Sequence, residues 1–599
     1  MTCIGILNIH TDERNFRTYS FEINKMVDLK TKPFNLSDKK IQWVEETIKK
    51  MTLDEKIGQL FINLTLQRDP ESLDRLINKY HIGGVRWQGG TLEEIYEQNK
   101  YFQEHSKVPV LIAANCEAGG NGAVSEGTFI ATGAACGASK TSDTVRAMAR
   151  VGAMEARSVG CNWTFAPVCD VVSNWRNTIV NTRAFGNDPE LVAERSLAYM
   201  EEMNRAGLAC AAKHFPGDGS EERDQHLVMG CNDLSTEEWD ESFGKVYKKL
   251  IDAGLESVMV GHICQRAYTK KFNPEIKDED ILPATLSPEL LQGLLRGQLG
   301  FNGLIVTDAT HMAGLTAAAD RKHAMQGVVA AGCDMILFFN DHEEDIAYVR
   351  EGIEDGTITA ERLDDALHRI LGLKAHLGLD ELMFPKKEDL KIVGCEEHHR
   401  LAEQAADESI TLVKDTQKIL PVDPEKKKRV LLYFIESAPV SSVDGADPAK
   451  KILVEELEKA GFEVNAPKDY YEYEMESPSK FNKFRMMEHE SREEFKKNTD
   501  LVLFVIDMKG YAKENNTRLT YSVSHSHEIP WFVKEVPTVA VSLNYTNHLY
   551  DVPMMKTFVN AYGSTPEYIR KLVEKLTGKS EFKGQYNDLV WCDRWDTRL

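Results

Sequence analysis

The sequence predicts an α/β protein in which a (β/α)8 TIM-like barrel is followed by an α/β sandwich domain. The chain has 599 residues, more than a single hydrophobic core usually organises. Eight short apolar runs, most of them separated by helical patterns, lie between about residues 40 and 375. Further apolar runs, interspersed with charged helical stretches, follow after residue 395. Alternation of this kind is typical of parallel sheets covered by helices.

The eight expected barrel strands are short and apolar, as buried parallel strands usually are. They are residues 57–62, 83–87, 108–115, 163–171, 208–215, 257–263, 303–308 and 335–339. The first helix is expected over residues 39–51, and Thr52 with Glu55 forms a capping-box pattern for the next. Residues 143–160 and 188–207 are also helical in pattern. A doubly wound sheet is the alternative, because spacing alone does not separate the two folds.

The chain divides into an N-terminal arm (residues 1–35), the barrel (36–375), a linker (376–395) and the sandwich (396–599). The arm is either ordered or an extension before a start at Met26. Sandwich strands are expected at residues 410–415, 429–435, 500–507, 537–544 and 556–563. The charged stretch 470–497 is expected to be a solvated helix or loop. The second domain has no GxGxxG after a strand and no GxxxxGK[ST] motif, so nucleotide binding is not assigned to it, and no cofactor is expected.

The composition of the chain limits the classes of molecule that it is expected to bind. Lys and Arg number 72 against 94 Asp and Glu, giving a net charge of −22, so nucleic acid and anionic membranes are not expected partners. No apolar run reaches the roughly 20 residues of a membrane helix, and no signal peptide is evident at the N-terminus. The 11 cysteines form no CxxC pairs, which favours a reducing cytoplasm. The oligomeric state is left open between monomer and homodimer.

Polar residues gather at the carboxyl ends of the expected strands, where a barrel collects its chemistry around one mouth. They are Arg86, Asn115, Glu117, Asp170, Lys213, His214, His262 and Asp308. The densest stretch, KHFPGDGSEERDQH, follows directly after an apolar run and ends at His226. Lys213 and His214 are adjacent, so they point to opposite faces unless the strand is bulged.

Asp224 and His226 are spaced so that, in extended backbone, a carboxylate can orient an imidazole for proton transfer. Asp308 ends an apolar strand and can serve as a carboxylate nucleophile. The structural alternatives are a solvated loop for the first two and a helix N-cap for Asp308. A metal site is a rival explanation of His214, Asp218, Asp224 and His226, but no specific ligand spacing supports it. The sequence contains no GxSxG motif, so Ser-His-Asp catalysis is not supported.

Several ordered motifs resemble glycoside hydrolase family 3, and within it the β-N-acetylhexosaminidases. They are MTLDEKIGQLF, NWTFAPVCDV, NTRAFGNDPELV, KHFPGDG followed by DQH, and LSPELLQGLLRGQLGFNGLIVTDATHM. The resemblance implies a retaining mechanism with Asp308 as nucleophile, His226 as acid/base and Asp224 as its partner. It implies a carbohydrate substrate bound by Lys213, His214, Arg183 and Asp170, with Asn115, His262 and Met312 as further subsite residues.

The chain departs from the family pattern at four places. Asp218 stands where KHFPGHG has its second histidine, Asn115 and Ala309 each replace an aspartate, and the arginine of D-x-E-G-G-R is missing. These changes concern sugar recognition more than the reaction. The leading interpretation is an exo-acting β-N-acetylhexosaminidase. A glycoside phosphorylase, a β-glycosidase of altered specificity such as for N-acetylgalactosamine, and a non-catalytic sugar-binding protein are the alternatives.

Overall fold

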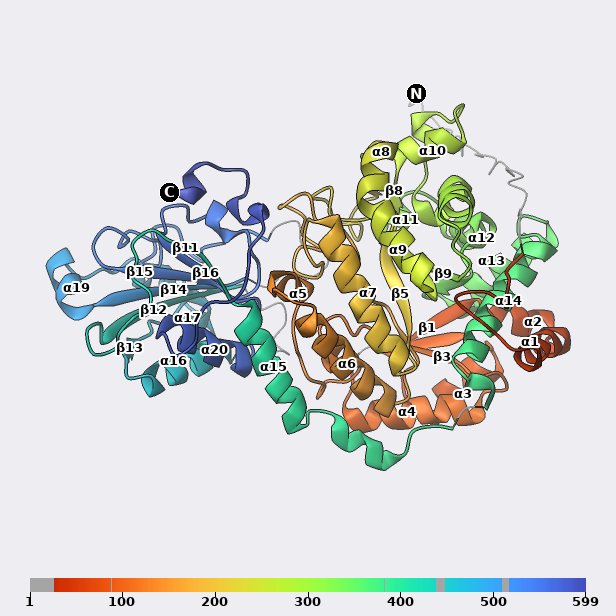
Figure 1. Cartoon of the computed structure of the whole chain (residues 1–599), viewed down its shortest axis with the longest axis horizontal. Coiled ribbons are helices and arrows are strands. Elements are labelled where there is room, and N and C mark those ends of the chain that lie inside the picture. The colour runs from red at the N-terminus through yellow and green to blue at the C-terminus, as the bar shows by residue number, and fades with distance from the viewer. Residues whose placement is uncertain (1–25, 88, 382, 438–447, 509–516) are drawn as a thin grey trace, which may run out of the picture.

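The computed structural model describes residues 26–87, 89–381, 383–437, 448–508 and 517–599. Most of the expected N-terminal arm, residues 1–25, lies outside the described part. Figure 1 shows two bodies, a barrel on the right and a sheet domain on the left, with α15 (Glu396–Ser409) between them. In the described residues, no helix is long and apolar enough to cross a membrane.

The first body is a closed barrel of eight parallel strands in the order β1-β10-β9-β7-β5-β4-β3-β2. This confirms the predicted barrel and excludes the doubly wound alternative for this part of the chain. Seven of the strands lie within the expected apolar runs or extend one residue beyond them. The first expected strand, residues 57–62, is wrong over residues 57–59, which end α2 (Leu53–Gln59), and β1 begins only at Phe61. The eight strands are β1 Phe61–Thr65, β2 Gly84–Trp87, β3 Leu111–Ala114, β4 Trp163–Thr164, β5 Ala209–Phe215, β7 Ser257–Val260, β9 Leu304–Ala309 and β10 Met335–Leu337.

Helices cover the outside of the barrel (Figure 1). The capping box predicted at Thr52 and Glu55 is present and starts α2. The longer helices are α1 Asp38–Lys50, α3 Pro70–Asn78, α4 Leu92–His105, α6 Asp143–Ser158, α7 Pro189–Arg205, α9 Lys245–Ala253, α12 Arg321–Ala331, α13 His342–Glu354 and α14 Ala360–His376. The shorter ones are α2 Leu53–Gln59, α5 Gly133–Ala138, α8 Thr236–Trp239, α10 Arg266–Phe272 and α11 Ala313–Thr316.

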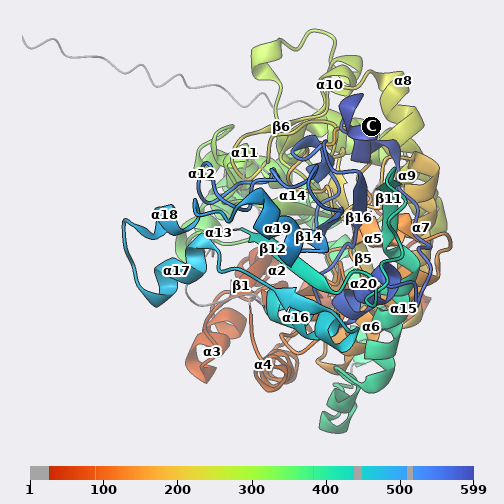
Figure 2. The ribbon, with the colours of Figure 1, turned by 90° about the vertical axis from the view of Figure 1, so that its left-hand side faces the viewer.

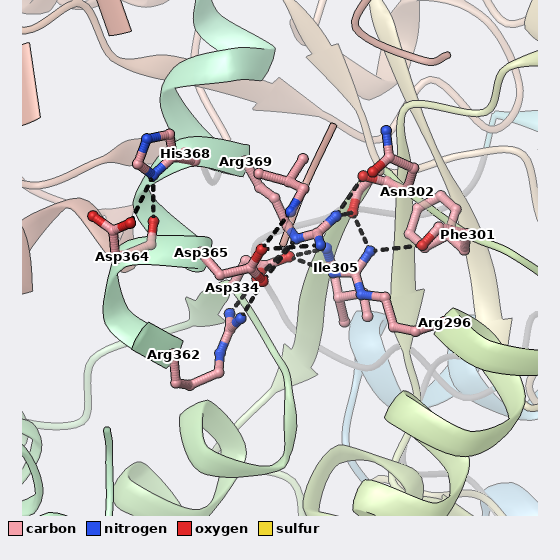
Figure 3. Close-up of polar contacts among 12 residues, drawn as sticks. Arg296, Phe301, Asn302, Ile305, Asp334, Arg362, Asp364, Asp365, His368 and Arg369 are labelled. Atoms are coloured by element: carbon pink, nitrogen blue, oxygen red, sulfur yellow. Dashed lines mark hydrogen bonds and ion pairs between the residues drawn. The ribbon is translucent and has the colours of Figure 1, made fainter. Parts of the chain in front are cut away.

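A buried ion-pair network closes the amino end of the barrel (Figure 3). Asp334, just before β10, accepts from the Ile305 backbone N–H at 2.7 Å and pairs with Arg296 at 3.0 Å. On α14, Arg362 also pairs with Asp334, and Arg369 binds Asp365 at 3.0 Å. Because barrel chemistry is placed at the opposite, carboxyl end of the strands, we assign this network to stability.

The second body is a six-stranded sheet in the order β11-β16-β15-β14-β12-β13, parallel except for β11. All the predicted sandwich strands are present. The strands are β11 Thr411–Asp415, β12 Arg429–Glu436, β13 Glu463–Asn465, β14 Leu501–Asp507, β15 Thr538–Ser542 and β16 Thr557–Asn560. Only β13 was not predicted. Its three residues form no apolar run, and the side chains of its first and last residues, Glu463 and Asn465, are exposed.

The two faces of this sheet bury different side chains. Val430 and Leu432 pack into the core shared with α16 (Ala449–Lys459) and α20 (Pro566–Leu576), whereas Leu431 and Tyr433 pack into a second cluster. This alternation confirms a sandwich. Residues 470–497 lie mainly in three short helices. They are α17 Tyr470–Glu476, α18 Asn482–Arg485 and α19 Arg492–Asn498. Of these, α17 and α18 project from the side of the domain in Figure 2.

Candidate active site

The polar residues expected at the barrel mouth do come together there. Lys213 and His214 lie on β5 and Asp308 on β9, while Glu117, Asp170 and His262 follow β3, β4 and β7. The pairing register of β5 with β7 shifts between Ala212 and Phe215. This irregularity resolves the expected conflict, because the adjacent Lys213 and His214 both contact acidic residues of the mouth.

Glu117 is the centre of the first cluster. Its Oε1 accepts from Lys213 Nζ at 2.6 Å, and its two oxygens bind Arg183 in a bidentate pair at 2.7 and 2.8 Å. Burial opposes ionisation of Glu117, but the two cations hold its pKa well below the usual range. Burial lowers the pKa of Lys213, an effect that Glu117 opposes. Sequence reasoning placed Glu117 at the mouth but gave it no role.

Asp170 is the centre of the second cluster. Its Oδ2 lies 2.8 Å from His214 Nδ1, and its Oδ1 accepts backbone N–H groups from His214 at 3.1 Å and Asp218 at 2.8 Å. These bonds fix the His214 ring and the start of the following loop. Asp170 is almost fully buried, with 1% of its surface exposed.

Asp218, which sequence reasoning placed only in the alternative metal site, holds this loop. Its Oδ1 accepts from Asn177 Nδ2 at 2.8 Å, and Asn177 also donates to the Glu221 carbonyl at 2.8 Å. Burial and the charge of Asp170 raise the pKa of Asp218 to about 7. Asn177 carried no signal in the sequence, since an isolated asparagine in a loop is common.

Asp224 and His226 form a paired carboxylate and imidazole. Asp224 Oδ1 lies 2.6 Å from His226 Nδ1 and also accepts the His226 backbone N–H at 2.8 Å. The Asp224 side chain is buried, whereas 22% of the His226 side chain is exposed. With Nδ1 held by the carboxylate, Nε2 is the nitrogen that can exchange a proton with a bound molecule.

Backbone contacts join this loop to the segment that follows Asp308. The Ala313 and Gly314 N–H groups donate to the carbonyls of His226 and Gln225, both at 3.1 Å. The half-buried Asp308 accepts from the Ala309 N–H at 2.7 Å. Burial opposes its ionisation, but the nearby His214 and other histidines hold the pKa of Asp308 below its ordinary value. A carboxylate and an oriented imidazole therefore share one mouth.

His262 and Met312 are buried to the same degree as Asp170 and Lys213. His262 is fully buried, with Nδ1 3.0 Å from Thr285 Oγ1 and Nε2 3.0 Å from the Ala309 carbonyl. Met312 is 2% exposed.

Asn115 and Arg86 are the remaining polar residues of the mouth. In the described part of the chain, the buried Oδ1 of Asn115 has no hydrogen-bond partner. Burial lowers the pKa of Arg86, which the charges of Glu117 and Asp308 oppose.

Within the described residues, no three His, Cys, Asp or Glu side chains are arranged to hold a metal ion.

The sandwich domain reaches the rim of the mouth. Asn547 Nδ2 donates to the Trp175 carbonyl at 3.3 Å, and the Trp175 and Tyr550 rings lie 4.7 Å apart. Because Trp175 and Asn177 share one loop, the sandwich domain supports the loop that holds Asp218.

A TIM-like barrel with a carboxylate and an aspartate-paired histidine at its mouth has the groups that an enzyme of nucleophilic and acid/base catalysis requires. Residues 52–373 match the model of the glycosyl hydrolase family 3 N terminal domain, more than half of the chain. The chain therefore belongs to glycoside hydrolase family 3, and it is an enzyme.

Similar proteins cover nearly the whole chain. A protein of Cellulomonas fimi named "Beta-N-acetylglucosaminidase/beta-glucosidase" is 41% identical over 577 residues, which is 96% of this chain and 100% of that protein. The structure of a β-glucoside phosphorylase, BglX, is 36% identical and superposes with a TM-score of 0.87 over 95% of this chain and 99% of its own. A family 3 β-N-acetylglucosaminidase from Paenibacillus sp. str. FPU-7 is 25% identical, with a TM-score of 0.74 over 89% and 98%.

Proposed function

We propose that the enzyme removes terminal β-linked N-acetylglucosamine or glucose by a retaining mechanism with a covalent intermediate on Asp308. The observation that carries the proposal is the Asp224–His226 pair, whose nitrogen and oxygen lie 2.6 Å apart on a loop bonded to the segment after Asp308. The name of the Cellulomonas fimi relative supports both sugars.

In the first step, an Asp308 carboxylate oxygen attacks the anomeric carbon as the glycosidic bond breaks. His226, with its Nδ1 held by Asp224, acts as the acid and gives an Nε2 proton to the departing oxygen. The lowered pKa of Asp308 keeps this carboxylate ionised and therefore nucleophilic. In the second step, the neutral imidazole takes a proton from the incoming acceptor, which attacks the same carbon and releases Asp308.

The polar clusters of the mouth bind the sugar in this proposal. Lys213, His214 and Arg183 are cationic or hydrogen-bonding groups held by Glu117 and Asp170, so their donors are preoriented toward sugar hydroxyls. We assign His262 to support of the mouth, because Thr285 and the Ala309 carbonyl already contact both of its ring nitrogens. Met312 remains a proposed subsite residue.

Asn115 is the residue that we propose reads a hydroxyl differently from the family pattern. Its buried Oδ1 has no partner in the described residues, and its amide can donate as well as accept. A sugar hydroxyl would satisfy that oxygen when substrate binds. An ionised aspartate at this position could only accept.

Inorganic phosphate is the second acceptor that we consider, which would make the enzyme a phosphorylase. The similarity to the β-glucoside phosphorylase covers 95% of this chain. A neutral imidazole carries no negative charge during the second step, whereas a carboxylate base would repel a phosphate anion near the anomeric carbon. The other acceptor, water, gives hydrolysis.

The test is a panel of aryl β-glycosides of glucose, N-acetylglucosamine, N-acetylgalactosamine and xylose, each assayed with and without phosphate. Asp308→Ala is the inactive variant, and Asp74→Ala, which removes an exposed carboxylate on α3, is the matched control. Release of aryl alcohol that requires Asp308 supports the proposal, and a sugar 1-phosphate product favours phosphorolysis. Binding of the sugars without any turnover would contradict the proposal and favour a sugar-binding protein.

We also propose that the enzyme acts in the cytoplasm on a small carbohydrate. The ten cysteines of the described part of the chain are all unpaired, as in a reducing compartment.

A further inference from the structure

Two cysteines face each other beside the candidate active site. The short strands β6 (Gly230–Cys231) and β8 (Ile263–Cys264) pair in parallel, with Cys231 directly opposite Cys264. Their sulfur atoms lie 3.3 Å apart. Paired residues of adjacent strands have Cα atoms about 4.8 Å apart, which lies within the range that a disulfide spans. The backbone here already has the spacing that a disulfide between them needs.

Each of the two cysteines is close in sequence to a residue of the mouth. Cys231 ends the loop that carries Asp224 and His226, and Cys264 comes two residues after His262. The Gly230 N–H donates to the His262 carbonyl at 3.0 Å, and the Asn232 N–H donates to the Cys264 carbonyl at 2.8 Å. A covalent bond between the two sulfurs would therefore tie the histidine-bearing loop to the segment after β7.

We infer that Cys231 and Cys264 are a site of reversible oxidation, at which a peroxide forms a disulfide that lowers the activity of the enzyme. Cys231 is half-buried and Cys264 is 6% exposed, so a small oxidant can reach the pair. Among the other cysteines of the described residues, only Cys395 is exposed to a similar degree. The pair thus combines access with a neighbouring thiol, which the other positions lack.

The chemistry balances with hydrogen peroxide as the oxidant. The hydrogen bond with Cys264, burial and the Asp233 carboxylate, 3.0 Å from Cys231 Sγ, raise the pKa of the Cys231 thiol. The hydrogen bond with Cys231 lowers the pKa of Cys264, which therefore ionises first. The Cys264 thiolate attacks one peroxide oxygen, giving a sulfenic acid and hydroxide. Cys231 then attacks that sulfur, forming the disulfide and releasing water.

The bond would change the loop because the sulfurs must approach from 3.3 Å to about 2.05 Å. Cys231 also donates its backbone N–H to Glu221 Oε1 at 2.5 Å, and the Glu221 carbonyl accepts from Asn177. Movement of Cys231 is thus transmitted to the contacts that hold the Asp218 part of the same loop. We expect the position of His226 relative to Asp308 to shift, and turnover to fall several-fold.

The experiment treats the full-length enzyme with hydrogen peroxide and maps its peptides by mass spectrometry without reduction. The expected result is one cross-linked peptide pair containing Cys231 and Cys264, two hydrogens lighter than the separate peptides, that disappears with dithiothreitol. Turnover of an aryl β-glycoside should fall several-fold and recover with the reductant. The activity measurement rests on the proposed function, whereas the peptide map does not.

Cys231→Ser, which changes one atom at a half-buried position, should keep its activity under peroxide and form no cross-link. Cys395→Ser, at the other accessible cysteine, should behave as the unaltered enzyme. Absence of the cross-linked peptide would overturn the inference. A cross-link that leaves turnover unchanged, or a loss of turnover that Cys231→Ser does not prevent, would also overturn it.

Discussion

The Asp224 carboxylate binds His226 twice, through the ring Nδ1 at 2.6 Å and through the backbone N–H at 2.8 Å. One oxygen, Oδ1, makes both contacts, so ring and backbone are fixed together. This relationship gives the imidazole one orientation and leaves Nε2 as the nitrogen available to a bound molecule. In the proposed mechanism, it is what allows a histidine to do the work that most glycosidases assign to a carboxylic acid.

His226→Ala should reduce turnover most for substrates with poor leaving groups. General acid catalysis typically contributes about 10²–10⁴-fold, and an alkyl glycoside should lose that much. A dinitrophenyl glycoside, whose leaving group needs no proton, should lose less than about tenfold in its first step. Pre-steady-state release of the aryl group measures that step. His399→Ala, at an exposed histidine, is the control, and equal losses on both substrates would contradict the acid role.

Glu117→Gln should weaken sugar binding, because it removes the negative charge that holds both Arg183 and Lys213. We expect kcat/KM to fall by roughly 10–100-fold, mainly through KM, since donors to charged acceptors are the stronger ones. Steady-state kinetics on an aryl β-glycoside measure the change. Glu104→Gln, at an exposed glutamate of α4, should leave both constants unchanged. An unaltered KM in Glu117→Gln would show that the cluster does not organise the sugar site.

Asn115→Asp should change which sugar is preferred. Asparagine can donate to a sugar oxygen and accept from a hydroxyl, whereas an ionised aspartate can only accept. The ratio of kcat/KM between glucosides and their C4 epimers should therefore shift by about tenfold or more. Asn121→Asp, an exposed position in the same loop, is the matched control. The same ratio in both variants would remove Asn115 from the specificity site.

Asp218→Asn should improve stability at alkaline relative to acid pH. Burial and Asp170 raise the pKa of Asp218 to about 7 from an ordinary 3.8. A raised carboxyl pKa stabilises the fold while the group is protonated; this contribution is complete below about pH 4 and is lost as the pH rises through about 7. The variant cannot ionise but keeps an oxygen for Asn177.

Thermal unfolding of the two proteins at about pH 5 and about pH 8 measures this difference. The Tm of Asp218→Asn relative to the unaltered enzyme should rise by on the order of 1–3 °C between these pH values. A Tm difference that does not depend on pH would contradict the protonation of Asp218.

Much of the fold could be predicted because buried parallel strands leave continuous apolar runs in the sequence. The run over residues 163–171 is instructive, since only Trp163–Thr164 is paired as a regular strand. Pro167 has no N–H to donate, so the pairing beyond it continues only as an isolated bridge between Val168 and Lys213. Sequence patterns located that segment but not where its regular pairing ends.

The contacts of the candidate site were likewise predictable only in part. The contact between Asp224 and His226 was predictable because the two residues are close in sequence. The expected extended backbone is wrong, because residues 225–227 form a turn in which the Leu227 N–H donates to the Asp224 carbonyl at 2.9 Å. Glu117 and Lys213 are 96 residues apart, and Asn177 and Asp218 are 41 apart. Contacts over such distances depend on how strand ends are placed around the barrel, so the roles of Glu117 and Asn177 became visible only in the structure.

The most direct test of the proposed mechanism is to trap the covalent intermediate with an activated 2-deoxy-2-fluoro-β-glucoside. The fluorine slows both steps, and the activated leaving group lets the first outrun the second. Intact-mass measurement should show one fluorosugar per chain, and peptide mapping should place it on Asp308, with no label in Asp308→Ala. Label on another residue, or continued turnover of aryl glycosides by Asp308→Ala, would contradict the assignment of Asp308 as the nucleophile.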